Sequence, residues 1–415
     1  MRGATDHKKM LVIGHQWPQP EATAAGQRMW QLLQGFGEAG YRITFVSAAA
    51  REKHSAPLKS LGIVSQPVKL NHPSFDQWLK TSHFDVVLFD RFLTEEQFSW
   101  RVREQLPDSV LLLDTEDLHS LRHSRETAVR ANRDWEVSDW LEHPVLYREL
   151  ASIIRCDLSL IISRVELDLL HARLPFLEGR LFYLPFQFAR DATSTGPGFS
   201  ERRGFIFVGN GKHRPNLDAI SRLKTEIWAI LRERVPDTTL KIYGAYLPDG
   251  ITNLHAPREG FEVQGWAPRL EPIFENTRLQ LAPLRFGAGV KGKILNGLRF
   301  GLPTLSSSIG WEGIYEGTAP VDFLANTPGA FVRKAALLYS SEEAWSRSRA
   351  MQLRVSAPHF ETSLDALLKA IENPAERQES LTETSKVLQK MLRHQAFDRL
   401  RYFSRWIEAK ENRSN

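Results

Sequence analysis

Two patterns of hydrophobic residues alternate along the chain. Short runs of Val, Ile, Leu and Phe, such as residues 11–15 and 85–91, are typical of buried parallel strands. Between such runs, stretches such as 23–38 repeat apolar residues at a spacing near 3.6, which indicates helices that cover a sheet. The alternation of strands and helices predicts an α/β fold.

Two series of these elements predict two domains. In the first series, strands are expected at 11–15, 43–47, 85–91, 110–114, 158–163 and 181–185, and helices at 23–38, 94–105 and 146–155. In the second, strands are expected at 204–209, 239–244, 261–265, 279–284 and 303–307, and helices at 215–235, 290–300 and beyond 326. Each series predicts a doubly wound parallel sheet, and the paired sheets are expected to face a central cleft.

Breaks in these patterns set the domain boundaries. Residues 191–203 have no hydrophobic period and are rich in Gly, Pro, Ser and Thr, which is typical of a linker. We therefore predict an N-terminal Rossmann-like domain at 1–190 and a C-terminal Rossmann-like domain at 204–373. The polar, charged segment 374–415 is predicted to be a helical tail.

Composition narrows the class of protein. A chain of 415 residues is long enough for more than one core. The single cysteine, Cys156, lies in an apolar run, which excludes a disulfide framework and predicts a buried core residue in a reducing compartment. No stretch approaches the roughly 18 apolar residues of a membrane span, and the N-terminus lacks the apolar region of a signal peptide. We therefore expect a cytoplasmic protein.

The net charge of the chain says little about its binding partners. The chain carries 54 basic and 49 acidic residues, a net charge of +5, which mildly favours partners of negative charge. That excess is too small to predict a nucleic-acid-binding protein.

The segment with the clearest chemistry joins the strand at 279–284 to the helix at 290–300. Gly287 and Gly289 let the backbone approach a ligand, and the amides at a helix N-terminus attract an anion. Lys291 and Lys293 lie in the first turns of this helix, where the helix dipole disfavours cations unless an anion is bound. Arg285 adds a planar donor beside them. The segment predicts an anion site, with a tight turn and two solvated lysines as the alternative.

The same glycines also fit a dinucleotide-binding pattern. Gly287, Gly289 and Gly292 have the required spacing, and Glu312 follows about 20 residues later. That pattern belongs after the first strand of its domain, whereas several strands precede it here. A nicotinamide-dependent dehydrogenase is therefore disfavoured.

The loop after the first predicted strand offers further candidates. Gly26 permits close approach at a helix start, and Arg28 offers a hydrogen-bond donor. His15 follows the strand directly, where a structural histidine and a catalytic one are both compatible with the sequence.

Acidic residues follow two other strands of the first domain. Asp90, next to Arg91, and the group Asp114, Asp117 and His119 are expected at the carboxyl ends of their strands, where a carboxylate can orient or deprotonate a hydroxyl. Helix capping by Asp114 or Asp117 is the alternative.

Other polar groups predict no catalytic site. Glu166 and Asp168 are expected on a helix face. The run Arg122, Arg125, Arg130 and Arg133 is interpreted as a solvated helix face, with an acidic acceptor or a membrane surface as alternatives. The chain contains no motif that calls for a bound metal, so no cofactor is predicted.

The ordered set of motifs resembles the group 1 (family 4, GT-B fold) glycosyltransferases over most of residues 10–370. In the second half the resemblance is carried by residues 207–210, 213–220, 242–244, 263–266, 282–284, 287–295, 301–303 and 312–314. In the first half it is carried by residues 20–26, 40–46 and 163–166.

The resemblance implies a metal-independent hexosyltransferase that retains the anomeric configuration, with a nucleotide diphosphate sugar as donor. It implies diphosphate-binding roles for Gly209, Lys212, Arg214, Arg285, Gly287, Gly289, Lys291 and Lys293. It implies nucleoside-binding roles for Gln264, Gly265, Trp266 and Asn296, and roles in the donor loop or acceptor site for Gly26, Arg28, Asp90 and Asp114. The catalytic candidates are Asp117, His119 and His15.

The chain also departs from the family pattern. Two glutamates that are common in the family are replaced by Ala288 and Asn296, and a common histidine of the first domain by Glu116. The Arg and Lys that often follow the first strand of the second domain are replaced by Asn210 and Pro215, which leaves Lys212 or Arg214 as substitutes.

These observations lead to one expectation and two alternatives. We expect transfer of a sugar to a glycan or lipid-linked acceptor in cell-envelope polysaccharide biosynthesis, at the inner face of the membrane if the protein associates peripherally with it. One alternative is a GT-B-shaped protein that binds a nucleotide sugar or glycan without transferring it. The other, a transferase with a nucleic-acid acceptor, is disfavoured.

Overall fold

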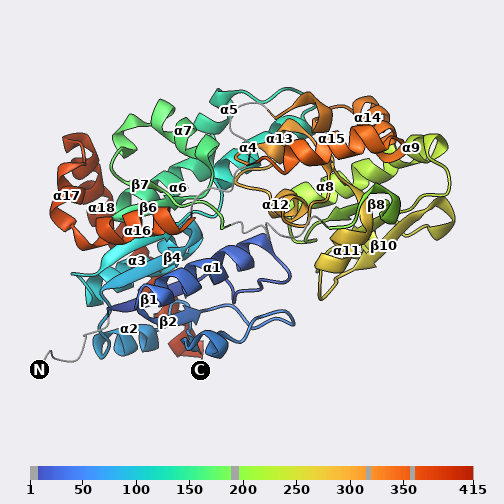
Figure 1. Ribbon diagram of the computed structural model, residues 1–415. Coiled ribbons are helices and arrows are strands. Elements are labelled where there is room, and N and C mark those ends of the chain that lie inside the picture. Colours follow the sequence, from blue (N-terminus) through green and yellow to red (C-terminus); the bar gives the residue numbers. More distant parts are fainter. Residues whose placement is uncertain (1–7, 188–195, 315–318, 356–359, 415) are drawn as a thin grey trace, which may run out of the picture.

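The protein is described by a computed structural model, which covers residues 8–187, 196–314, 319–355 and 360–414. Two α/β domains lie side by side (Figure 1). The predicted linker 191–203 lies partly outside the described residues, and the first strand of the second domain already begins at Arg203.

The first domain contains a seven-stranded parallel sheet with the order β3-β2-β1-β4-β5-β6-β7. Its strands are β1 Lys9–Gly14, β2 Arg42–Ser47, β3 Val64–Pro67, β4 Val86–Asp90, β5 Val110–Asp114, β6 Leu158–Ile161 and β7 Leu181–Tyr183. Only β3 was missed by the sequence pattern, because its four residues lie at the sheet edge and are not buried.

The second domain contains a five-stranded parallel sheet with the order β10-β9-β8-β11-β12. Its strands are β8 Arg203–Val208, β9 Leu240–Tyr243, β10 Phe261–Gly265, β11 Thr277–Ala282 and β12 Thr304–Ser306. Both sheets are doubly wound, so the predicted fold class is confirmed.

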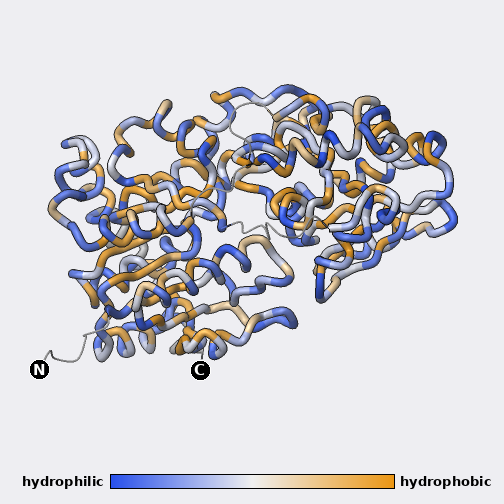
Figure 2. The backbone as a smooth tube through the Cα atoms, viewed as in Figure 1, coloured by the Kyte–Doolittle hydropathy of each residue, from blue (hydrophilic) through white to orange (hydrophobic). Residues whose placement is uncertain are grey.

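Helices cover both faces of each sheet. In the first domain these are α1 Ala24–Glu38, α2 Pro73–Lys80, α3 Arg91–Gln105, α4 His119–Arg130, α5 Val137–Leu141, α6 Pro144–Arg155 and α7 Arg164–Arg173. In the second they are α8 Arg214–Arg222, α9 Ala229–Arg234, α10 Asp249–Thr252, α11 Glu271–Asn276, α12 Gly292–Arg299, α13 Ser308–Trp311, α14 Pro328–Ser340 and α15 Glu342–Gln352. Hydrophobic residues concentrate in the strands and on the helix faces that cover them (Figure 2). Cys156 is fully buried in this core, as expected.

The end of the chain returns to the first domain as α16 Phe360–Glu372, α17 Pro374–Glu379 and α18 Glu383–Ser414 (Figure 1). Helix α16 buries Phe360 and Leu364 in the first domain's core, and Leu364 packs against Gly35 of α1. Helix α18 lies along α3 and α6. The predicted boundary at residue 373 is therefore wrong for α16, because its apolar face completes the core of the first domain.

Within the described residues, no helix combines the length and apolar character needed to cross a membrane.

Candidate active site between the two sheets

A cavity of about 390 Å³ lies between the carboxyl ends of the two sheets. In each sheet the strand order reverses at one point, between β1 and β4 and between β8 and β11, and loops diverge from there. Such switch points of open α/β sheets are where ligands bind. The loops after β1, β5, β8 and β11 all contribute to the lining.

The glycine loop between β11 and α12 forms the wall from the second domain. Gly289 has φ 62°, and a β-carbon there would lie 2.8 Å from the β-carbon of Asp117. A larger residue would therefore push the two domains apart. Ala288, one of the two positions where the family commonly has glutamate, is only 8% exposed and packs with the core of the first domain.

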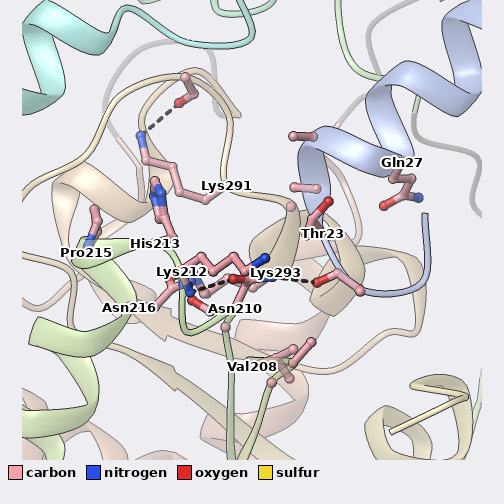
Figure 3. Close-up of a pocket in the computed structure, with 18 of the residues that line it drawn as sticks. Thr23, Gln27, Val208, Asn210, Lys212, His213, Pro215, Asn216, Lys291 and Lys293 are labelled. Atoms are coloured by element: carbon pink, nitrogen blue, oxygen red, sulfur yellow. Dashed lines mark hydrogen bonds between the residues drawn. The ribbon is translucent and has the colours of Figure 1, made fainter. Parts of the chain in front are cut away.

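The two predicted lysines line this wall, but their ammonium groups have different partners. Nζ of Lys293 donates a hydrogen bond to Oδ1 of Asn216 at 2.7 Å, next to Asn210 and Lys212 (Figure 3). Nζ of Lys291 points away from this group and donates to the carbonyl oxygen of Gly289 at 2.8 Å. It also lies 3.5 Å from Oε2 of Glu312. Glu312 thus partly compensates the charge of Lys291, whereas the ammonium of Lys293 contacts the neutral amide of Asn216 and lies 5.4 Å from the ring of Phe207.

Burial makes the charged form of both lysines less favourable, because nearby negative groups compensate their charges only in part. Burial, with the nearby charge of Lys291, lowers the pKa of Lys293 to about 7. Burial also lowers the pKa of Lys291, although Glu312 opposes that shift. A bound anion would stabilise the charged form of both lysines, so this wall is suited to a phosphate-bearing ligand.

A network from the first domain forms the opposite wall. Asp117 pairs with Arg122, and Nε2 of His119 lies 3.4 Å from Oδ1 of Asp117. Burial alone would raise the pKa of Asp117, but the charge of its partner Arg122 holds it well below its usual range. Burial lowers the pKa of His119 to about 3, and that of His213, which reaches in from the second domain, to about 3. Both imidazoles are therefore neutral at pH 7.

Asp114 and Asp117 do not cap helix α4. The amides of His119 and Ser120 donate instead to Glu149 of α6, at 2.6 and 2.9 Å. The Asp117 carboxylate is left to face the cavity.

Buried ion pairs hold the two domains together around the cavity. Arg125 donates to both carboxylate oxygens of Glu312, each at 2.7 Å, and to the carbonyl of Gly287 at 2.7 Å. Oε1 of Glu166 accepts from the amide of Gly289 at 2.7 Å. Burial, helped by Asp117, raises the pKa of Glu166 to about 8.

Glu166 and Asp168 lie on helix α7 as predicted, but the prediction of a solvated arginine face is only partly correct. Glu166 points inward across the domain boundary, and only Asp168 is exposed. In the arginine run, Arg122 and Arg125 turn inward because they lie three residues apart on one face of α4, whereas Arg130 and Arg133 are solvated.

At the rim, side chains of the two domains interlock beside Trp266. Its ring lies 4.2 Å from that of His54, and its Nε1 donates to the carbonyl of Glu21 at 3.4 Å. Nζ of Lys212 pairs with Glu52 at 2.6 Å and lies over the ring of Tyr246.

The structure brings about half of the predicted site residues into the cavity lining. These are Asp117, His119, Gly209, Lys212, Gly287, Gly289, Lys291, Lys293, Trp266 and Asn296. Their individual roles stay predictions.

Several predicted residues from the first domain lie beneath the lining. Arg28 is fully buried and donates to the carbonyl of Pro185 at 2.7 Å and to Asp114 at 3.3 Å. Asp90 accepts from the backbone of His15 at 2.9 Å, and neither residue lines the cavity. Gly26 makes room for the backbone of Gln19, so it shapes the loop rather than admitting a ligand.

Several predicted site residues of the second domain also point away from the cavity. Arg285 pairs with Asp218 at the surface, and Arg214 lies 3.3 Å from Glu126. Gln264 donates to Glu262 and is exposed, and Gly265 lies outside the lining. Consecutive residues of an extended chain point in opposite directions, so only some of each predicted group can reach one cavity.

Sequence reasoning missed Arg91, Glu116, Arg122, His213 and Asn216 as lining residues. Their positions after strands could have indicated that four of them face the cavity. Arg91 and Glu116 lie within two residues of the ends of β4 and β5, and His213 and Asn216 follow β8. Among the described residues, no group of three or more His, Cys, Asp or Glu is placed to hold a metal ion.

Comparison with known proteins agrees with this geometry. Residues 202–341 match the family model of group 1 glycosyl transferases, which covers the wall with the two lysines. No curated protein sequence matches the chain. The resemblance predicted from the sequence is thus confirmed at the level of group 1.

Solved structures of similar fold cover almost the whole chain. Sucrose-phosphate synthase from Thermosynechococcus elongatus is 12% identical, with a TM-score of 0.61 over 88% of this chain and 99% of its own. The pneumococcal O-GlcNAc transferase GtfA, in complex with UDP and GlcNAc, is 10% identical, with a TM-score of 0.60 over 89% and 99%. Anabaena HepE, in complex with UDP, is 13% identical, with a TM-score of 0.59 over 88% and 100%. At these identities the likeness shows the fold, which is GT-B.

Proposed function

We propose that this protein, whose second domain matches the group 1 glycosyltransferases, transfers a sugar from a nucleotide diphosphate sugar to a hydroxyl group of an acceptor. One observation carries the proposal. Lys291 and Lys293 of the family-matched domain share a 390 Å³ cavity with the buried polar network of Asp117, His119 and Arg122. Pockets of this size accommodate ligands such as nucleotide sugars.

The chemistry follows from the charges of the two walls. When the bond between the sugar C1 and the diphosphate oxygen breaks, negative charge grows on the diphosphate. Lys293, Lys291 and the amides at the start of α12 stabilise that charge from fixed positions. The acceptor oxygen bonds to C1, and its proton passes to the departing diphosphate. Asp117, which its lowered pKa keeps ionised, is a candidate to orient the acceptor hydroxyl.

Further features of the reaction are part of the proposal. Retention of configuration, membership of family 4 and a cytoplasmic location rest on the resemblance and on composition. The lysines and the helix start supply the positive charge that a metal ion would otherwise supply, so we propose a metal-independent reaction without a cofactor. We place Trp266 and Asn296 near the nucleoside because both line the cavity beside the lysines.

A donor screen tests the proposed function. Thermal shifts with UDP-, GDP-, ADP- and TDP-sugars should show one class that raises the melting temperature, because a ligand that binds only the folded state stabilises it. The same donor should lose its sugar when a mixed pool of glycan and lipid-linked acceptors is added. Binding without transfer or hydrolysis would favour the alternative of a nucleotide-sugar-binding protein.

We propose that the acceptor is lipid-linked and that α18 contacts the membrane. Tyr402, Phe403 and Trp406 are 72, 61 and 58% exposed on this helix, and the ammonium of Lys410 lies 5.4 Å from the ring of Trp406. The side chain of Arg405 is 51% exposed beside them. Aromatic side chains flanked by cations suit the interface of a bilayer with anionic headgroups.

Vesicle co-sedimentation tests this contact. The protein should bind vesicles that contain phosphatidylglycerol and lose binding when Tyr402, Phe403 and Trp406 are all replaced by Ser. Val387→Ser is the matched control, because Val387 is 62% exposed elsewhere on α18. Self-association through the aromatic residues, or absence of vesicle binding, would contradict the proposal.

A further inference from the structure

Six described residues other than glycine have a left-handed backbone, and they divide into two chemical classes. Outside the cavity lining these residues are Asn71, Asn132 and Asp237. Within the lining they are Arg91, Glu116 and Tyr246. Asn and Asp adopt this conformation several times more often than other side chains do. The unusual residue types are therefore confined to the cavity.

A left-handed conformation is strained for such residues, and it persists only where the surrounding structure enforces it. Arg91 has φ 72° and Glu116 has φ 62°. They follow the neighbouring strands β4 and β5, and β4 borders the switch point of the first sheet. Strain at two adjacent strand ends of one cavity indicates that these side chains are held there for a ligand.

The carboxyl group of Glu116 has an unused oxygen. Its Oε1 is buried and, within the described part of the chain, has no hydrogen-bond partner. Burial and the nearby charge of Asp114 raise the pKa of Glu116 well above its usual range, although Arg91 opposes the shift. A carboxyl group accepts hydrogen bonds through its oxygens, and its protonated form, which the raised pKa favours, also donates one.

The neighbours of Glu116 indicate which part of a ligand it meets. Its backbone oxygen would lie 3.3 Å from a β-carbon on Gly289, so it adjoins the glycine loop that faces the phosphates. A carboxyl group is a poor partner for phosphate and a good one for a hydroxyl group. A sugar attached to the diphosphate would begin at this point.

On the basis of the proposed function, we propose that Glu116 binds a hydroxyl group of the transferred sugar through Oε1, and that Arg91 positions it there. Glu116 is then the residue of the first domain that distinguishes a nucleotide sugar from the bare nucleotide. A residue kept for stability would not combine backbone strain with an unpartnered buried oxygen.

Glu116→Gly tests the proposal, because it removes both the strain and the unpartnered group. We expect the melting temperature to rise by about 2 °C while the affinity for the nucleotide sugar selected in the donor screen falls about tenfold. The affinity for the corresponding nucleoside diphosphate, measured by calorimetry, should stay within about twofold. Glu116→Gln retains a donor and an acceptor, so it should recover most of the nucleotide-sugar affinity.

Asp237→Gly is the matched control. Asp237 has φ 58° in an exposed turn far from the cavity lining, so its replacement should also raise the melting temperature but leave both affinities unchanged. A lower melting temperature of Glu116→Gly, or equal losses for the sugar and the bare nucleotide, would overturn the proposal.

A change in acceptor binding would also contradict the proposed role of Glu116. If donor affinity is unchanged while the KM of the acceptor rises, Glu116 holds the acceptor rather than the transferred sugar. All these results presuppose nucleotide binding by the unmodified protein, whose absence would contradict the proposed function instead.

Discussion

The two walls of the cavity are built in different ways. The wall with Lys291 and Lys293 comes from one short segment, in which a strand end, two glycines and a helix start follow each other in the sequence. The wall with Arg91, Glu116 and Asp117 comes from two strand ends, and its side chains are aimed by left-handed backbones and buried charges. The glycine loop and its two lysines are therefore encoded locally, whereas the groups facing them depend on the assembled sheet.

The largest expected effect comes from the lysine wall. Lys293→Ala should lower kcat/KM about 100-fold, the equivalent of about 2–3 kcal/mol for a lost charge-assisted contact with the diphosphate. Lys291→Ala should lower it as well, but partly by releasing the carbonyl of Gly289, which Lys291 holds. Steady-state kinetics with varied donor would measure both. If both variants had unchanged kinetics, the prediction that these lysines bind the diphosphate would be wrong.

The pH dependence of donor binding sharpens the assignment to Lys293. Its pKa is about 7 in the empty cavity, and a bound diphosphate would raise it, so binding takes up a proton. Affinity for the nucleotide sugar should therefore fall as the pH rises above 7, by about tenfold between pH 6.5 and 8.5. Lys293→Arg should flatten this dependence, because arginine stays charged. A wild-type affinity independent of pH would contradict the prediction.

A smaller effect is expected from the contact that joins the walls. Arg125→Met removes the hydrogen bonds to Glu312 and Gly287 and leaves Glu312 with Lys291 alone. We expect donor affinity to fall about fivefold, because Glu312 keeps only part of its charge compensation and the contacts of Arg125 across the domain boundary are lost. Calorimetry and small-angle scattering would measure the loss and the opening. Arg130→Met, on the exposed face of the same helix, should change neither, and the double variant Arg125→Met/Glu312→Gln should recover part of the loss.

The smallest effect is expected from metal removal. If the lysine wall provides the positive charge, transfer should stay within about twofold after treatment with a chelator. A loss of activity that Mg²⁺ or Mn²⁺ restores would show that the lysines do not suffice.

Much of the fold could be predicted because its signals are local. The apolar runs located every strand except β3, and the spacing near 3.6 located α1, whose N-cap is Thr23. The same kind of signal placed Gly287, Gly289, Lys291 and Lys293 at one helix start, and all four line the cavity.

The rest was decided by packing between segments far apart in the sequence. Arg28, Asp90 and Arg285 have the residue types of a site, but Arg28 and Asp90 bind groups beneath the lining and Arg285 pairs at the surface. The sequence pattern placed Glu166 and Arg125 on helix faces and gave no sign of their partners. In the structure, each binds the glycine loop across the domain boundary.

The two doubly wound domains and the grouping of two glycines and two lysines at the start of α12 follow from the sequence alone, because periodicity, glycine and charge act over a few neighbouring residues. Only the tertiary structure decided which strand-end side chains face that site and that α16 completes the first core. Those outcomes depend on side-chain direction, backbone strain and desolvation, which arise when distant segments meet.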